Sequence, residues 1–223
     1  MGGNQSNDPA LVGVEGHGRV IGDKFNLIES CTCEARKAGR LQDAISGDAV
    51  AIIVGGGDRW KEELDEVLRL VGDRPVTYFY INDQIKSFDQ PGYACTLHPD
   101  KLNGHFNWLA VRKKAGLSPP LEVWSHRKHG AVTHDTASAE WKGSSGLFAV
   151  QVARRKGFRK VIGCGVPMTV EGGHFERRQK WQSAIAFRQG WLTCRNEITP
   201  DFRSMSGWTA DIFGRPTQEW LGQ

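Results

Sequence analysis

Four small residues, Gly143, Ser144, Ser145 and Gly146, stand directly before an apolar-periodic segment that predicts a helix ending at Gly157. The first N–H groups of a helix have no partner inside it, and the helix dipole adds partial positive charge beside them. A helix start of this kind readily binds phosphate or carboxylate groups. The four residues are therefore candidate nucleotide-binding residues.

Three glycines, Gly55, Gly56 and Gly57, follow an apolar run that predicts a buried strand at 49–54. They do not fit the dinucleotide fingerprint Gly-x-Gly-x-x-Gly, because Trp60 stands where glycine or alanine is needed. The ending Gly-Lys-Ser/Thr of a P-loop is also missing. Hydride transfer and P-loop chemistry are therefore unsupported, and a tight turn and a phosphate cradle stay equally open for these glycines.

Polar or small residues also end two later predicted strands. Asn82 and Asp83 follow a strand at 76–81, and Gly165 follows a strand at 161–164. Asn82 and Asp83 either cap a turn through side-chain to backbone hydrogen bonds or bind the ribose or base of a nucleotide. Because parallel α/β sheets bind ligands at the carboxyl ends of their strands, we expect these residues to lie in one site with Gly55, Gly56 and Gly57, called the glycine turn below.

Two histidines are candidates for acid–base catalysis. His98 precedes a proline at the end of a predicted strand, and His174 follows Gly172 and Gly173. A histidine beside glycines can enter a site when a loop closes. A purely structural role stays open for both. No Ser-His-Asp order, His-Glu-x-x-His motif or carboxylate cluster is present, which disfavours hydrolases and metalloenzymes.

The predicted strands and helices that position these residues alternate along the chain. This alternation indicates an α/β fold with a Rossmann-like, doubly wound, mostly parallel sheet. Residues 1–47 are read as an N-terminal arm and residues 48–223 as the Rossmann-like domain. Beyond the strands named above, we expect strands at 93–97 and 121–124, helices at 60–70 and about 175–190, and an amphipathic stretch at 101–115.

Aromatic residues mark the C-terminal part of the chain. Trp181, Ile185, Phe187 and Trp191 are expected to form the buried side of the 175–190 helix. A short helical tail follows, with helix starts at Ser206 and Thr217. Its aromatic residues are expected to cover an edge of the sheet; they are Trp208, Phe213 and Trp220.

The composition is that of a globular protein, with 39% hydrophobic and 24% charged residues. The formal net charge of +4 is spread over four basic clusters, which are better read as helix ends than as a polyanion surface, although nucleic acid stays open as a partner. No run is long and apolar enough for a membrane span, and no signal peptide is evident. Five cysteines without a repeated spacing indicate a reducing compartment, and we expect a cytoplasmic protein.

Taken together, residues 49–221 resemble a family of small phage and prophage proteins often labelled "norphogenetic protein", which are found beside virion-assembly genes. The segments that carry the resemblance are the glycine turn, Ile81-Asn82-Asp83, Thr96-Leu97-His98-Pro99, Gly143-Ser144-Ser145-Gly146-Leu147-Phe148, Gly165-Val166-Pro167, His174-Phe175 and Arg203-Ser204-Met205-Ser206-Gly207-Trp208-Thr209. The resemblance implies expression in a phage-infected bacterium and an association with virions or phage structural proteins.

More distantly, the core resembles the Rossmann-like sialyltransferase and pterin-pyrophosphokinase-like group. That resemblance implies a nucleotide or nucleotide-sugar ligand, with Mg²⁺ as a candidate assistant. The nucleotide would be bound by Gly55, Gly56, Asn82, Ser144, Ser145 and Gly146. His98 or His174 would then be the acid–base residue.

Two functions from different classes follow from these observations. The first is a nucleotide-dependent transferase that moves a glycosyl or phosphoryl-type group, in which loop amides stabilise phosphate charge. The second is a non-enzymatic virion or morphogenesis protein built on a nucleotide-binding fold, since a fold does not determine a function. A third, a protein that sequesters a host nucleotide signal against bacterial defence, would bind tightly without turnover.

Overall fold

The computed structural model describes residues 47–136, 144–175 and 180–223. The chain divides after Arg40 into two units, and the second, Leu41–Gln223, contains all of the described residues. Apart from Gly47, the N-terminal arm expected at 1–47 lies outside the described residues, and so does the candidate Gly143.

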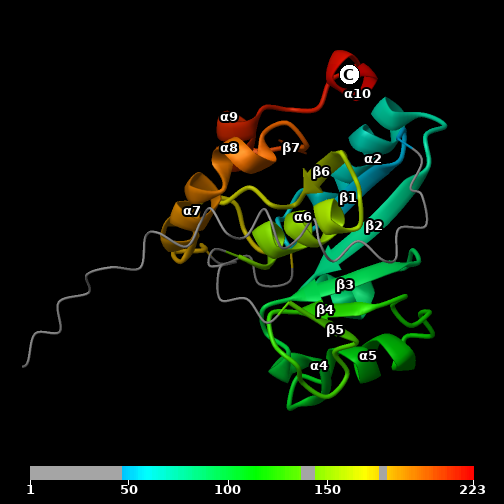
Figure 1. The fold of residues 1–223 in the computed structure, drawn as a ribbon. Helices are drawn as coiled ribbons and strands as arrows, with labels where there is room; N and C mark the ends of the chain where they lie inside the picture. The colour runs from blue at the N-terminus through cyan, green and yellow to red at the C-terminus, as the bar shows by residue number, and fades with distance from the viewer. Residues whose placement is uncertain (1–46, 137–143, 176–179) are drawn as a thin grey trace, which may run out of the picture. The chain divides into compact units, whose positions relative to one another are not determined.

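Strands and helices alternate along the described chain (Figure 1). The strands are β1 (Val50–Val54), β2 (Val76–Ile81), β3 (Gly92–Thr96), β4 (Val123–Ser125), β5 (His134–Asp135), β6 (Lys160–Cys164) and β7 (Phe202–Ser204). The helices are α2 (Trp60–Val71), α3 (Gln84–Ser87), α4 (Asp100–Asn103), α5 (Trp108–Lys114), α6 (Ser145–Arg155), α7 (Ala184–Thr193), α8 (Arg195–Ile198), α9 (Gly207–Phe213) and α10 (Gln218–Gly222).

The described strands form one parallel sheet in the order β5-β4-β3-β2-β1-β6-β7. From β1 the chain adds strands in one direction as far as β5. It then returns through α6 and places β6 on the other side of β1. The strand order therefore reverses between β1 and β6, where doubly wound folds bind their ligands. This arrangement confirms the predicted α/β, Rossmann-like fold.

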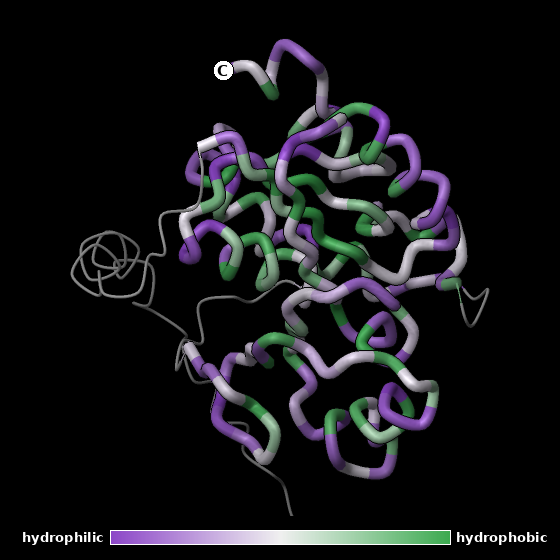
Figure 2. The backbone as a smooth tube through the Cα atoms, turned by 90° about the vertical axis from the view of Figure 1, so that its right-hand side faces the viewer, coloured by the Kyte–Doolittle hydropathy of each residue, from purple (hydrophilic) through white to green (hydrophobic). Residues whose placement is uncertain are grey.

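Helices cover both faces of the sheet, which explains why β1 is a continuous apolar run. All residues of β1 have 0% exposure. Ala51 and Ile53 point to the face that carries α6, whereas Ile52 and Val54 point to the face that carries α2. Such alternation is expected because successive strand side chains point to opposite faces. Figure 2 shows the hydrophobic stretches in the middle of the fold.

The amphipathic stretch expected at 101–115 contains two short helices, α4 and α5, and not one continuous helix. The first, α4, ends where the N–H of Gly104 donates to the carbonyl of Asp100 over 3.1 Å. The second, α5, begins after Asn107, whose φ of 38° is left-handed and whose Oδ1 accepts from the N–H of Ala110 over 3.3 Å. Local capping therefore interrupts an amphipathic pattern that looks continuous in the sequence.

The helix expected at 175–190 is wrong in its bounds, because α7 begins only at Ala184. Its buried residues are Ala184 and Trp191, seven positions apart, which is two helical turns. Ile185, expected on the buried side, is 59% exposed. Trp181 lies before the helix and packs at its edge with Phe187, with ring centroids 5.7 Å apart.

The helical tail is present as expected. Thr217 caps α10, because its hydroxyl accepts from the N–H of Trp220 over 3.1 Å. Ser206 stands at the N-cap of α9 without a side-chain cap bond. Phe213 and Trp220 are buried at 3% and 4% exposure, so the tail covers apolar surface beside the edge strand β7. The strands β5 and β7 were not predicted, because His134-Asp135 and Phe202-Arg203-Ser204 are mostly polar and form no apolar run.

Candidate functional site

A hydrogen-bonded triad joins three elements at the carboxyl edge of the sheet. Asn82, at the end of β2, accepts two hydrogen bonds on its Oδ1. One comes from the hydroxyl of Thr96, the last residue of β3, over 3.0 Å, and the other from the hydroxyl of Ser145, the first residue of α6, over 2.9 Å. The triad thus holds two strand ends and the start of α6 together.

The hydrogen-bond directions in this triad determine how the amide of Asn82 is oriented. The hydroxyl of Thr96 accepts from the N–H of His98 over 2.9 Å, and that of Ser145 accepts from the N–H of Leu97 over 3.1 Å. Each hydroxyl therefore uses its single hydrogen on the Oδ1 of Asn82. The Nδ2 of Asn82, with two N–H donors, has no hydrogen-bond partner among the described residues.

The start of α6 presents further donors beside this amide. Ser144 is the N-cap: its hydroxyl accepts from the N–H of Leu147 over 3.2 Å and from the indole N–H of Trp191 over 3.1 Å. The backbone N–H groups of Ser145 and Gly146 have no partner within the described part of the chain. Ser145 therefore offers a ligand its backbone N–H, since its hydroxyl proton is already committed to Asn82.

The glycine turn is held mainly by internal bonds. The N–H of Gly55 donates to the carbonyl of Cys164 over 2.8 Å, and that of Gly57 donates to the carbonyl of Gly165 over 2.9 Å. A side chain at Gly55 would collide with the Gly165 carbonyl, and one at Gly56 would lie 2.5 Å from the Nε2 of His174. Close packing at the β1–β6 switch point therefore requires glycine here, whether or not a phosphate binds.

A short segment at residues 173–175, called the strap below, lies over the glycine turn and carries His174. Gly57 and His174 form an antiparallel bridge, the N–H of Asp58 donates to the carbonyl of Gly173 over 3.0 Å, and the N–H of Phe175 donates to the carbonyl of Gly56 over 2.9 Å. These bonds bring a residue far along the chain onto the end of β1.

The strap places His174 against a carboxylate. The Nε2 of His174 lies 3.4 Å from the Oδ2 of Asp83, whose side chain is 9% exposed. Asp83 is also 3.0 Å from the Nζ of Lys86. A carboxylate that contacts one ring nitrogen orients an imidazole and stabilises its protonated form, which is the arrangement that acid–base catalysis uses.

His98 lies at the same edge but is differently placed. The residue as a whole is exposed although part of its ring is covered, and among the described contacts it is joined to the triad only by its backbone N–H. Partial burial of the ring, together with the charge of Lys101, lowers the pKa of His98 from its usual 6.5. The ring is therefore mostly neutral at pH 7, and of the two candidate histidines only His174 contacts a carboxylate among the described residues.

Sequence reasoning missed three residues of this edge. Thr96 belongs to the triad, Gln84 donates from its Nε2 to the carbonyl of Gly55 over 2.9 Å, and Glu63 accepts from the N–H of Gly165 over 2.7 Å. Glu63 had a signal in the sequence, because it lies four positions before the buried Val67 on the apolar stripe of α2.

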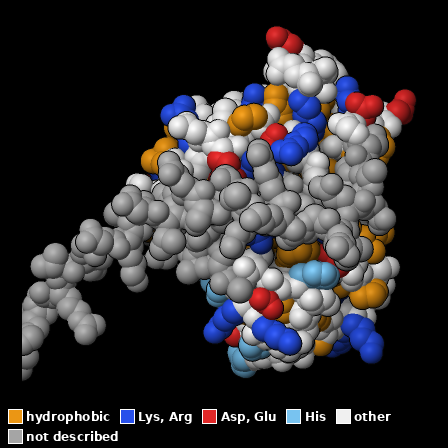
Figure 3. Space-filling model, in the orientation of Figure 1, with side chains coloured by type: hydrophobic (Ala, Val, Ile, Leu, Met, Phe, Trp, Pro, Cys, Tyr) orange, Lys and Arg blue, Asp and Glu red, His pale blue; other side chains and the backbone are white. Residues whose placement is uncertain are grey.

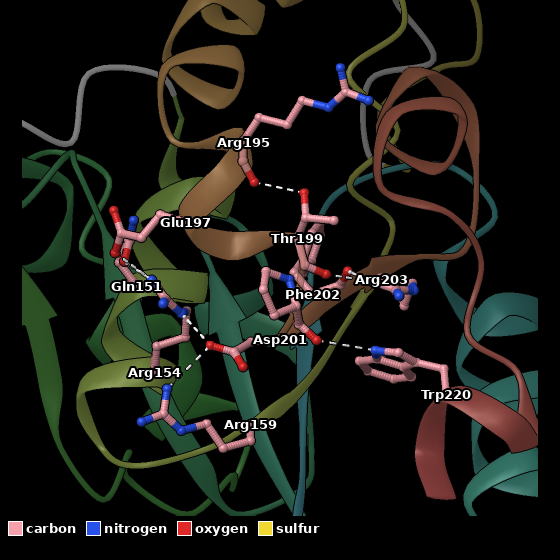
Figure 4. A network of polar contacts seen from close by, with 11 residues as sticks. Gln151, Arg154, Arg159, Arg195, Glu197, Thr199, Asp201, Phe202, Arg203 and Trp220 are labelled. Carbon is pink, nitrogen blue, oxygen red and sulfur yellow. Dashed lines mark hydrogen bonds and ion pairs between the residues drawn. The ribbon is translucent and has the colours of Figure 1, made fainter. Parts of the chain in front are cut away.

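Among the described residues, three members of the basic clusters bond within the fold. Arg112 is 1% exposed and donates to the backbone carbonyls of Phe88 and Ser118. Arg154 and Arg159 both approach the Oδ2 of Asp201, at 2.8 and 3.4 Å (Figure 4). On the face shown in Figure 3, Lys and Arg side chains lie in separate places with acidic ones among them. These contacts support the reading of the clusters as helix ends.

Two absences are observed within the described residues. Over 47–136, 144–175 and 180–223, no group of three or more His, Cys, Asp or Glu side chains could hold a metal ion. In the same ranges no helix has the length and apolar character needed to cross a membrane.

No family model, curated protein or solved structure matches this chain.

Proposed function

We propose that the protein binds a nucleotide or nucleotide sugar at the carboxyl edge of its sheet and transfers a glycosyl or phosphoryl-type group from it. The observation that carries the proposal is the oriented amide of Asn82 beside the N–H groups of Ser145 and Gly146, which have no partner in the part of the chain that the structure describes. These donors come from two elements and are held in place before a ligand arrives. Preorganised donors of this kind stabilise phosphate charge, both in binding and in a transition state.

In this proposal the residues have separate tasks. Asn82 and the start of α6 bind phosphate oxygens, and His174 moves the proton of the accepting group while Asp83 orients its ring. The glycine turn lets His174 pack closely against the end of β1, beside the switch point between β1 and β6. From the resemblance to phage proteins we further propose that this activity takes place in an infected bacterial cell.

A thermal-shift screen against nucleotides and nucleotide sugars, with and without Mg²⁺, tests the proposal. A ligand at about a hundred times its Kd stabilises the native state by roughly 2.7 kcal/mol. The informative variant is Asn82→Asp, which keeps the acceptor for Thr96 and Ser145 but replaces two donors by a negative charge. We expect it to abolish the shift.

Asn107→Asp is the matched control. Asn107 also has a left-handed backbone and also accepts a hydrogen bond through Oδ1, but it lies at the start of α5. This variant should respond to the ligand like the unmodified protein. A flat screen on folded protein, or an equal response of both variants, would refute nucleotide binding at this edge.

One observation favours the second candidate, a morphogenesis protein without catalytic activity. The backbone N–H groups of Gly55, Gly57 and Asp58 are all bonded to carbonyls of the protein, so most of the glycine turn is closed to a phosphate. This alternative predicts that the protein co-purifies with mature phage particles and that His174→Ala leaves particle yield unchanged. A loss of yield with His174→Ala would count against it.

A further inference from the structure

A polar cavity of about 310 Å³ lies between the start of α2 and the start of α9. It opens at the carboxyl end of β7, next to the switch-point strand β6. Its lining is rich in charged and hydroxyl side chains. The polar residues among them are Arg59, Glu63, Glu66, Ser206, Asp211 and Arg215.

The most unusual of these residues is Glu63, which is only 6% exposed. Its Oε2 accepts from the N–H of Gly165, and it forms no ion pair with any described Lys, Arg or His. A buried carboxylate without a cation is costly unless hydrogen bonds satisfy its oxygens. The N–H of Gly165 and the dipole of α2 compensate part of this cost, and hydrogen-bond donors of a ligand would compensate the rest.

Two groups that could bond to a ligand remain available around Glu63: a guanidinium, which donates, and a hydroxyl, which donates and accepts. Neither the guanidinium of Arg59 nor the hydroxyl of Ser206 has a partner among the described residues. Arg215, by contrast, is paired with Glu66 over 2.8 Å. The cavity therefore combines a buried acceptor, an unpaired cationic donor and a hydroxyl group.

This combination selects the class of ligand. Three carboxylates disfavour a purely anionic ligand, two guanidinium groups disfavour a cation, and the described residues provide no metal site. A hydroxyl group both donates and accepts, so neighbouring hydroxyls of one molecule can satisfy Glu63, Arg59 and Ser206 together. We propose that the cavity binds a small polyhydroxylated molecule of the sugar type, with Glu63 accepting from its hydroxyl groups.

The proposed role of this molecule as the acceptor in group transfer rests on the proposed function, whereas its binding does not. Gly165 connects the cavity to the proposed nucleotide site. Its N–H donates to Glu63 in the cavity, and its carbonyl accepts from the N–H of Gly57 in the glycine turn. A sugar bound in the cavity would thus lie next to the glycine turn. Its affinity can be measured without any nucleotide.

The test is an NMR titration of the full chain with glucose, galactose, mannose, N-acetylglucosamine and N-acetylneuraminic acid. We expect at least one sugar to shift the backbone amides of Gly207 and Ala210, which line the cavity. Glu63→Gln keeps an acceptor for the N–H of Gly165 but removes the charge, and it should weaken binding by at least about tenfold.

Glu62→Gln is the matched control, because Glu62 is the exposed neighbour on the same helical turn and does not line the cavity. It should bind the sugar like the unmodified protein. Ala210→Leu, which fills the cavity without removing a polar group, should also abolish binding. If no sugar shifts these amides, or if Glu63→Gln binds as well as Glu62→Gln, the proposal is wrong. A nucleotide response sensitive to Asn82→Asp would survive that result.

Discussion

The hydroxyl of Ser145 donates to the Oδ1 of Asn82 over 2.9 Å, although 63 positions separate the two residues in the chain. This bond connects the end of β2 to the start of α6. Because the same hydroxyl also accepts from the N–H of Leu97, removing it disturbs both neighbouring strand ends. The pair is therefore a structural tie and a means of orienting the amide of Asn82.

Replacing Ser145 by alanine tests this tie. Ser145→Ala removes one hydrogen bond and leaves the N–H of Leu97 without its acceptor, so we expect a loss of about 1–3 kcal/mol in the free energy of unfolding. Urea denaturation measures the change. Ser183→Ala is the control, because Ser183 is exposed at the start of α7 and its side chain forms no cap bond. A loss as large in the control would contradict the tie.

The packing of the strap can be tested at Gly56. In Gly56→Ala the new methyl group would lie 2.5 Å from the Nε2 of His174, so the ring of His174 has to shift, which loosens the packing of the strap on the turn. We expect faster hydrogen exchange of the amides of Asp58 and Phe175, which bond across the strap. Gly47→Ala, where the added methyl meets nothing within 4 Å, should leave both exchange rates unchanged. Unchanged protection in Gly56→Ala would show that the strap is not held by this contact.

The lowered pKa of His98 predicts a pH dependence of stability. The unfolded chain, with a histidine pKa near 6.5, binds a proton at a pH where folded His98 is still neutral. The contribution of His98 is therefore present above pH 6.5 and is lost as the pH falls through its folded pKa. Urea midpoints at pH 7.5 and pH 5 should differ less in His98→Gln than in the unmodified protein. An NMR titration midpoint at or above 6.5 for His98 would reverse this expectation.

Asp201 should matter more to stability than its neighbour Glu197. Asp201 is 8% exposed and approaches both Arg154 and Arg159, whereas the side chain of Glu197 is 49% exposed and approaches Arg154 alone (Figure 4). We expect Asp201→Asn to cost about 1–3 kcal/mol, because the largely buried guanidinium of Arg154 loses one of its two carboxylate partners. Glu197→Gln should cost about 0–1 kcal/mol, as for exposed ion pairs. Denaturant unfolding of the two variants side by side checks the order, and equal losses would contradict it.

The sequence by itself determined the class of fold and most of its core elements. β1, β2 and β6 are visible as apolar runs because both of their faces are covered, and α2 is visible through its period. The start of α6 was also correctly predicted, because its N-cap, Ser144, is a local signal. Interactions within a few residues dominate each of these features, so they can be read without knowledge of the fold.

The tertiary structure alone decided which residues meet. Asn82, Thr96 and Ser145 form a triad because of the order of the strands and the return of α6, and neither is encoded in local spacing. The same holds for the pairing of His174 with Asp83, which depends on the strap crossing the glycine turn. Contacts between segments that are far apart in the chain arise from the packing of the whole sheet. The types and spacing of residues along the sequence therefore do not predict them.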